Sequence, residues 1–165
     1  MMSEPNPSVA VTMTLNGQAV TETIPARTTL SEYLREYRRL TGVHRGCETV
    51  KCGACTVLVD GRSVKSCNML AAQANGHEVT TVEGLATDGH LTAMQQAFLD
   101  NHGMQCGYCT PGFVLAAIAL VDENDAPSVD EVRHGLTGNI CRCTGYTKIV
   151  ESVLDAADRM RGDDS

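Results

Sequence analysis

The chain has 165 residues, of which 42% are hydrophobic and 20% charged, a size that suits one ordinary domain or two small ones sharing a core. Its 13 Lys and Arg against 20 Asp and Glu leave a net charge of -7, which argues against the large basic surface of a nucleic-acid-binding protein. No apolar run approaches the roughly 20 residues of a membrane span, and the first residues lack the charged and apolar regions of a signal peptide. We therefore expect a cytoplasmic protein with no transmembrane segment and no nucleic-acid partner.

The first half of the chain predicts a small α+β unit. Alternating apolar residues around Asn-Gly and Asp-Gly turns predict two β-hairpins, over residues 9–24 and 56–65, and residues 78–82 predict a further strand. A capping-box pattern precedes an apolar stripe at helical spacing over residues 30–40, which stops at Gly42. This stripe predicts a helix that covers the sheet.

The second half predicts four helices. The first spans residues 92–102, and the second begins at Thr110, followed by a proline suited to the first helical position and by an apolar run that suggests burial on all sides. A third, short helix opens at Ser128, and a fourth spans residues 146–160 with one apolar face. The two halves together predict an α+β fold.

Eight cysteines are the main outlier in the composition. A chain without an export signal is expected to keep its thiols reduced, so this number indicates metal binding or catalysis rather than disulfides. The cysteines fall into two groups of four, and four thiolates complete one tetrahedral ligand set. The N-terminal set is Cys47, Cys52, Cys55 and Cys67, and the C-terminal set is Cys106, Cys109, Cys141 and Cys143.

The N-terminal set has the ligand spacing of plant-type ferredoxins, C-x4-C-x2-C followed by a fourth cysteine. A 2Fe-2S cluster with four thiolates carries about two net negative charges when oxidised, so it needs backbone N–H groups close by. Gly46, Gly53 and Ala54 are small enough to allow that approach, and the second hairpin can return Cys67 to the side of Cys55. A structural zinc site would more usually show two C-x-x-C pairs, and a thioredoxin-type pair would leave two of the four cysteines unused.

The C-terminal set is split between two junctions of predicted helices. Cys106 and Cys109 lie between two helices, and Cys141 and Cys143 lie in the turn before the last helix. Because helix N-termini offer free N–H groups and a positive dipole end, a dianionic cluster is favourable there, and we expect it to be buried in the helical unit. The spacing alone leaves a zinc site open.

Three strings in this order resemble the iron-sulfur subunits of the molybdenum hydroxylases, a family that includes xanthine dehydrogenase, aldehyde oxidoreductases and aerobic carbon monoxide dehydrogenase. They are GCETVKCGACTVLVDG (46–61), QCGYCTPG (105–112) and NICRCTGY (139–146), and the resemblance covers about residues 9–160. Within the family, Glu48-Thr49 and the SVKSC and AAQANG stretches are most similar to the small subunit of carbon monoxide dehydrogenase. In contrast to many relatives, residues 48–51 contain no glycine.

The resemblance implies a plant-type ferredoxin-like β-grasp domain over residues 1–83 and a helical domain over residues 84–165, each with one 2Fe-2S cluster. It implies two partners, a large subunit with molybdopterin (molybdopterin cytosine dinucleotide) and a medium subunit with FAD. The three subunits would form a dimer of heterotrimers. Through its partners, this complex would be able to lie at the inner face of the membrane. Electrons would pass from molybdenum to the C-terminal cluster, to the N-terminal cluster and then to flavin. Gln105, by a hydrogen bond, and Cys143 would contact the pterin.

The resemblance implies no catalytic residue for the substrate on this chain. The chain would be the iron-sulfur subunit of a heteromeric, molybdenum-dependent oxidoreductase. Its reaction is expected to be the oxidation of carbon monoxide with water to carbon dioxide. The alternatives are an aldehyde, purine or N-heterocycle dehydrogenase, and, outside this family, a free ferredoxin or a structural zinc module.

Overall fold

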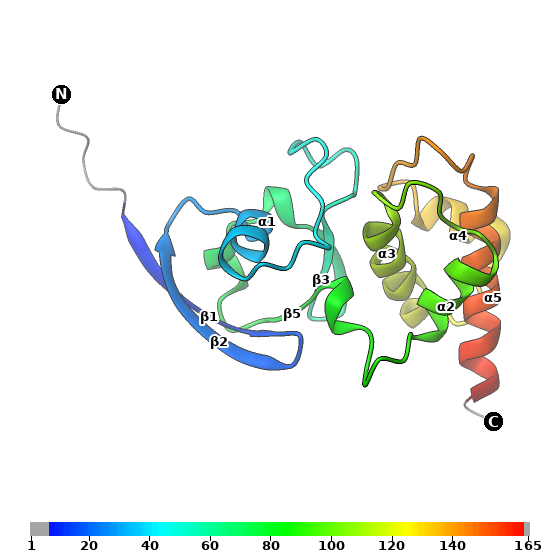
Figure 1. Cartoon of the computed structure of the whole chain (residues 1–165), viewed down its shortest axis with the longest axis horizontal. Coiled ribbons are helices and arrows are strands. Elements are labelled where there is room, and N and C mark those ends of the chain that lie inside the picture. Colours follow the sequence, from blue (N-terminus) through cyan, green and yellow to red (C-terminus); the bar gives the residue numbers. More distant parts are fainter. Residues whose placement is uncertain (1–6, 164–165) are drawn as a thin grey trace.

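The computed structural model describes residues 7–163 and contains one five-stranded sheet in the first half of the chain (Figure 1). The strand order is β2-β1-β5-β3-β4; β5 runs parallel to β1, and the other neighbours are antiparallel. Both predicted hairpins are confirmed. The strands are β1 (Ser8–Leu15), β2 (Gln18–Pro25), β3 (Thr56–Val59), β4 (Arg62–Lys65) and β5 (Glu78–Thr80).

Five α-helices complete the described structure, one beside the sheet and four in the second half (Figure 1). The four predicted helices of the second half are confirmed, with ends shifted by no more than about three residues. The helices are α1 (Leu30–Glu32), α2 (Ala93–Asp100), α3 (Thr110–Glu123), α4 (Val129–Gly135) and α5 (Thr147–Asp163). Along α3, most residues from Phe113 to Val121 are buried, as the apolar run predicts.

The prediction of one regular helix over residues 30–40 is wrong in its form and length. The chain forms a single α-turn, α1, and continues as a π-helical turn over Tyr33–Tyr37. The turn ends because Arg39 adopts a left-handed backbone, at φ 59°, and cannot continue a right-handed helix. Leu30, Tyr33 and Leu34 are nevertheless buried against the strands, so this segment does cover the sheet.

The buried side chains form two main cores, one in each half. The first lies between the sheet and the α1 segment, and the second lies among α2, α3, α4 and α5. Helix α3 faces the sheet in Figure 1, and a small cluster of Leu58 on β3 with Leu115 and Ala119 on α3 joins the two halves. The halves therefore meet along an apolar seam, which fixes the position of one relative to the other.

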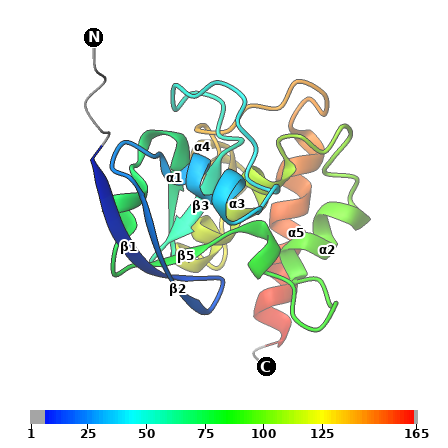
Figure 2. The same ribbon diagram turned by 60° about the vertical axis from the view of Figure 1, so that its left-hand side comes forward.

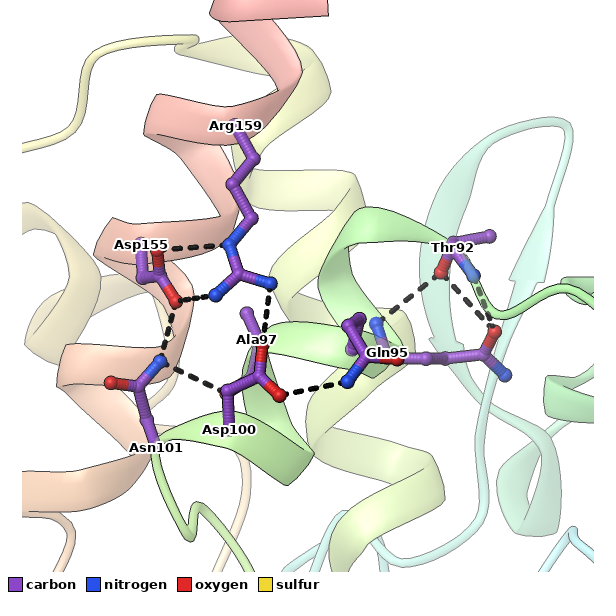
Figure 3. A network of polar contacts seen from close by, with 8 residues as sticks. Thr92, Gln95, Ala97, Asp100, Asn101, Asp155 and Arg159 are labelled. Carbon is purple, nitrogen blue, oxygen red and sulfur yellow. Dashed lines mark hydrogen bonds and ion pairs between the residues drawn. The ribbon is translucent and has the colours of Figure 1, made fainter.

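Helices α2 and α5 are tied together by a polar network on their outer side (Figure 3). Arg159 of α5 donates hydrogen bonds to Asp100 at 2.8 Å and to Asp155 at 2.6 Å and 3.0 Å. Asn101, just after α2, donates to the same Asp155 at 2.6 Å. The network thus links the end of α2 to the second half of α5.

No helix within residues 7–163 combines the length and apolarity needed to cross a membrane.

Candidate metal centres

The N-terminal cysteine set lies on the loop before β3 and at the end of the β3-β4 hairpin. The hairpin pairs Thr56 with Lys65, so the residues just outside this pair are also neighbours. Ser66 donates its backbone N–H at 3.3 Å and its hydroxyl at 2.6 Å to the carbonyl of Cys55. Cys67 is thereby brought beside Cys55, and the expected return of the chain is confirmed. Burial raises the pKa of the Cys55 thiol to about 11.

The pKa of Cys47 shifts in the opposite direction to that of Cys55, because the sulfur of Cys47 accepts backbone hydrogen bonds. The N–H groups of Thr49 and Cys52 lie 3.4 Å and 3.3 Å from Cys47 Sγ. Hydrogen bonds from Thr49, together with the one from Cys52, lower the pKa of Cys47 to about 6. Such a loop of N–H donors around a sulfur is an anion-binding arrangement.

The same loop uses left-handed backbone at two residues that are not glycine. Glu48 has φ 55° and Val50 has φ 70°, and a β-branched residue rarely adopts this conformation. Glu48 also forms an ion pair with Arg45 across the start of the loop. With no glycine in residues 48–51, this left-handed backbone places strain in the loop.

The C-terminal cysteine set lies on two loops at one end of the helical half. Cys109 is the residue before α3, and Cys143 lies four residues before α5. The sulfurs of Cys106 and Cys143 are 3.6 Å apart, whereas Cys109 and Cys141 form a second hydrogen-bonded pair. Burial raises the pKa of Cys109 to about 12.

Cys141 is the thiol of this set that resembles Cys47. Burial would raise the pKa of Cys141, but hydrogen bonds from Thr144 and from the N–H of Cys143 hold it below its ordinary value. Thr144 donates its hydroxyl at 3.1 Å and its N–H at 3.4 Å to Cys141 Sγ, and the N–H of Cys143 lies at 3.4 Å. Each cysteine set thus contains one sulfur surrounded by N–H donors.

The expectation that the C-terminal set is buried inside the helical half is wrong for two of its four members. Cys141 is buried and Cys109 half-buried, but Cys106 and Cys143 are exposed. Both exposed residues lie on loops outside the helix ends rather than on the helices, so the apolar core does not cover them. Gln105, next to Cys106, is also exposed.

The two cysteine sets face each other at the same end of the molecule, as Figures 1 and 2 show for the loops that carry them. The N–H of Ile140, next to Cys141, donates to the carbonyl of Cys52 at 2.9 Å. A second contact joins the loops, because the rings of His44 and Tyr108 stack with their centres 4.6 Å apart. One hydrogen bond and one ring stack therefore connect the loops that carry the two cysteine sets.

Hydrogen bonds in both directions also join Tyr108 to the segment that contains His44 and Arg45. Nδ1 of His44 lies 2.6 Å from the carbonyl oxygen of Tyr108, so this nitrogen carries the proton and donates. The hydroxyl of Tyr108 donates to the carbonyl of Arg45 at 3.0 Å. The cysteine spacing gives no signal for this contact, since the partners are more than 60 residues apart.

A polar network at the seam between the halves was also missed by sequence reasoning. Asn139 is buried and donates to the carbonyl of Gly53 at 3.1 Å, and it accepts a hydrogen bond from Nζ of Lys65 at 2.9 Å. Lys65 also donates to the hydroxyl of Thr56 at 2.8 Å. Burial lowers the pKa of Lys65, while the thiols of the N-terminal set act in the opposite direction.

The donor chemistry of both sets fits a binuclear cluster. Within the described part of the chain, no three Cys, His, Asp or Glu side chains meet closely enough to ligate a single ion. The thiols instead meet two by two, and in a 2Fe-2S cluster each iron takes two protein ligands. The N–H groups around Cys47 and Cys141 supply hydrogen bonds that stabilise the negative charge of such a cluster.

Comparison with known proteins agrees with this chemistry. A family model described as a 2Fe-2S iron-sulfur cluster binding domain matches residues 13–86, and a second one, described as a 2Fe-2S binding domain, matches residues 81–154. The chain is 48% identical to the nicotine 6-hydroxylase small subunit of Paenarthrobacter nicotinovorans, over 94% of each chain. It is also 48% identical to caffeine dehydrogenase subunit gamma of Pseudomonas sp. (strain CBB1), over 88% of this chain and 89% of the relative.

Solved structures show the same fold. A chain of quinoline 2-oxidoreductase from Pseudomonas putida 86 superposes with a TM-score of 0.91 at 41% identity, over 96% of this chain and 99% of that one. The aldehyde oxidoreductase from Desulfovibrio gigas gives 0.90 at 39% identity, and there this chain matches only 17% of a much longer polypeptide. With two cysteine sets in contact, two 2Fe-2S family matches and full-length relatives, the chain belongs to the small 2Fe-2S electron-transfer subunits of the molybdenum hydroxylases.

Proposed function

We propose that the chain carries electrons from a molybdopterin-binding subunit to an FAD-binding subunit through two 2Fe-2S clusters, each held by one cysteine set. The C-terminal set (Cys106, Cys109, Cys141, Cys143) is the ligand set nearer to molybdenum, and the N-terminal set (Cys47, Cys52, Cys55, Cys67) is the one nearer to flavin. When bound, the clusters supply one-electron redox chemistry.

The observation that carries this proposal is the contact between the two sets. The hydrogen bond from the N–H of Ile140 to the carbonyl of Cys52 connects a neighbour of Cys141 directly to a ligand of the other set. The stacked rings of His44 and Tyr108 hold the same two loops together. A free ferredoxin needs one cluster close to its surface, whereas two sets in contact suit a relay that passes electrons through the chain.

The exposed edge of the C-terminal set suits the entry point of the relay. Gln105, Cys106 and Cys143 are all exposed there, which leaves them accessible to a partner. We propose that Gln105 forms a hydrogen bond to the pterin and that Cys143 lies against it. Cys141, buried and on the side of the N-terminal set, is then the inner ligand of the same cluster.

The protein's own groups keep both sites ready for an anionic cofactor. The N–H groups of Thr49 and Cys52 are aimed at Cys47 Sγ, and those of Cys143 and Thr144 are aimed at Cys141 Sγ. Preformed donors of this kind lower the cost of placing negative charge in the site.

The substrate class proposed from the relatives is an N-heterocycle or an aldehyde. The printed names of the relatives refer to nicotine, caffeine and xanthine, and the solved structures to quinoline and aldehyde oxidoreductases. None of these names refers to carbon monoxide, and the expectation of a carbon monoxide dehydrogenase has no support from them. Carbon monoxide is therefore kept as one of the substrates to be tested with the isolated complex, not as the first choice.

We also propose that the two cores correspond to two domains, a plant-type ferredoxin-like β-grasp domain over residues 1–83 and a four-helix domain over residues 84–165. The strand order and the separate cores support this division. The proposed assembly is a dimer of heterotrimers with a large molybdopterin subunit, carrying molybdopterin cytosine dinucleotide, and a medium FAD subunit. The reduced thiols suit the cytoplasm, with any membrane contact made through the partners.

The relay is tested by Cys106→Ser in the complete complex. Substrate should no longer reduce the flavin at the wild-type rate, while dithionite should still reduce the N-terminal cluster. Unchanged turnover would refute the relay. Co-purification with a molybdenum subunit and a flavin subunit separates this function from that of a free ferredoxin, which would be isolated alone with both clusters.

A further inference from the structure

Lys65 is a partly buried cation at the seam between the two halves, and within residues 7–163 it has no carboxylate partner. Its Nζ donates hydrogen bonds to two neutral oxygens, Thr56 Oγ1 at 2.8 Å and Asn139 Oδ1 at 2.9 Å. The turn of the helical half packs closely over it, since a Cβ added at Gly138 would lie 3.4 Å from the same nitrogen. The ammonium group is therefore fixed in place by both halves.

Lys65 lies beside the N-terminal cysteine set. Strand pairing places it opposite Thr56, the neighbour of Cys55, and Cys67 follows it by two residues. Its partner Asn139 donates to the carbonyl of Gly53, which lies between Cys52 and Cys55. A lysine is seldom buried unless an anion compensates its charge. Neutral hydrogen bonds orient the ammonium group but do not neutralise it, so an anionic cluster on this cysteine set would supply the compensating charge.

We propose that Lys65 is a positioning residue whose fixed positive charge serves as the counter-ion of the N-terminal cluster and raises its reduction potential. This inference rests on the proposed function, because it requires a cluster on the N-terminal set. A reduced cluster carries one more negative charge than an oxidised one, so a nearby cation stabilises the reduced form more. Electrons arriving from the C-terminal cluster would thereby be favoured to move on towards the flavin side.

A purely structural role for Lys65 is the competing explanation. In that case its hydrogen bonds to Thr56 and Asn139 would hold the two halves together, and its charge would be incidental. Removing the charge alone separates the two roles. Lys65→Gln keeps a donor and loses the charge, Lys65→Met loses both, and Lys65→Arg keeps the charge.

Lys51 supplies a matched control. Lys51 directly precedes the ligand candidate Cys52 in the sequence, but its side chain is exposed. Solvent and salt screen an exposed charge far more than a buried one. Lys51→Met therefore removes one positive charge near the N-terminal set and leaves the partly buried charge of Lys65 in place.

The experiment is a redox titration of the full chain in its complex, followed by electron paramagnetic resonance of each cluster. At the wild-type midpoint potential, Lys65→Met and Lys65→Gln should lower the ratio of reduced to oxidised N-terminal cluster about tenfold, which corresponds to 59 mV for one electron. The C-terminal cluster should keep its midpoint, and Lys65→Arg and Lys51→Met should change the ratio less than about twofold.

The proposal is overturned if the neutral variants shift the N-terminal cluster no more than Lys51→Met does, or if Lys65→Arg shifts it as far as Lys65→Met. If both neutral variants lose the N-terminal cluster, iron analysis decides: retention by Lys65→Arg supports the counter-ion role, and loss from it as well contradicts that role. These readouts are independent of substrate turnover, so a failed relay would remain distinguishable from a failed counter-ion.

Discussion

Gly53→Ala should destabilise the chain strongly, because Gly53 lies where the N-terminal cysteine loop touches the helical half. Its backbone is left-handed, at φ 73°, between two ligand candidates. A Cβ at this position would lie 2.4 Å from the carbonyl oxygen of Gly138 and 2.6 Å from Cγ of Asn139. The Gly138 oxygen belongs to the backbone, so backbone would have to move, and the buried side chain of Asn139 would be displaced as well.

Three effects add up in this variant. An L-residue with left-handed backbone costs about 1–2 kcal/mol. Overpacking against the Gly138 turn costs about 1–3 kcal/mol. Displacing Asn139 also endangers its 3.1 Å hydrogen bond to the Gly53 carbonyl, and a buried polar group left unpaired costs about 1–3 kcal/mol. We expect a total loss of about 3–8 kcal/mol, a large share of the stability of a small protein.

Gly61→Ala is the matched control. Gly61 has nearly the same backbone angle, φ 77°, but a Cβ there would meet no atom within 4 Å. It should therefore show only the backbone cost of about 1–2 kcal/mol. The assay is denaturant unfolding of the cluster-loaded chain, followed by far-UV circular dichroism and by the visible absorption of the clusters. Equal losses in the two variants would refute the argument that Gly53 is required by the contact between the halves.

Three further predictions concern single features of the chain. Val50→Gly should raise the free energy of unfolding by about 0.5–1 kcal/mol, since Val50 is exposed at φ 70° and relief of the left-handed strain exceeds the entropy cost of glycine; a lower free energy of unfolding in a denaturant titration would contradict this. In the cluster-free chain, iodoacetamide should label Cys47 with an apparent pKa near 6 and leave Cys109 unlabelled at pH 7, because only the thiolate reacts; equal labelling rates would be inconsistent with the hydrogen bonds at Cys47. Arg159→Met should lower the thermal midpoint at pH 7. The hydrogen bond from Arg159 holds the pKa of Asp100 below its usual value. The stability contributed by the ion pair is therefore present above the unfolded pKa of about 3.9 and is lost as pH falls through the folded pKa. The difference in thermal midpoint between variant and wild type should narrow towards pH 3, and a difference that stays constant would argue against the ion pair.

Local patterns predicted most of the secondary structure. The Asn16-Gly17 turn and the alternating residues around it place the first hairpin, and the capping boxes at Thr92 and Ser128 place the starts of α2 and α4. The spacing of the cysteines also predicted that Cys67 returns beside Cys55, because a short hairpin has few other ways to close. Each of these features depends on residues that are close in the sequence.

The contacts that organise the centres depend on residues far apart, and no local pattern encodes them. Asn139 and Gly53 are 86 positions apart, and His44 and Tyr108 are 64 apart. The exposure of Cys106 was also missed, because a helix-junction position does not say whether the loop lies over the core or beside it. The π-helical turn after α1 likewise follows from packing on the sheet rather than from the apolar stripe.

The central claim is that the eight thiols form two ligand sets, on adjoining loops, for two binuclear clusters. Electron paramagnetic resonance of the dithionite-reduced complex, with spin integration and iron analysis of the same sample, tests it most directly. The account predicts about four irons and about two unpaired spins per chain, one from each cluster. One spin or none per chain, or zinc in place of iron, would contradict it.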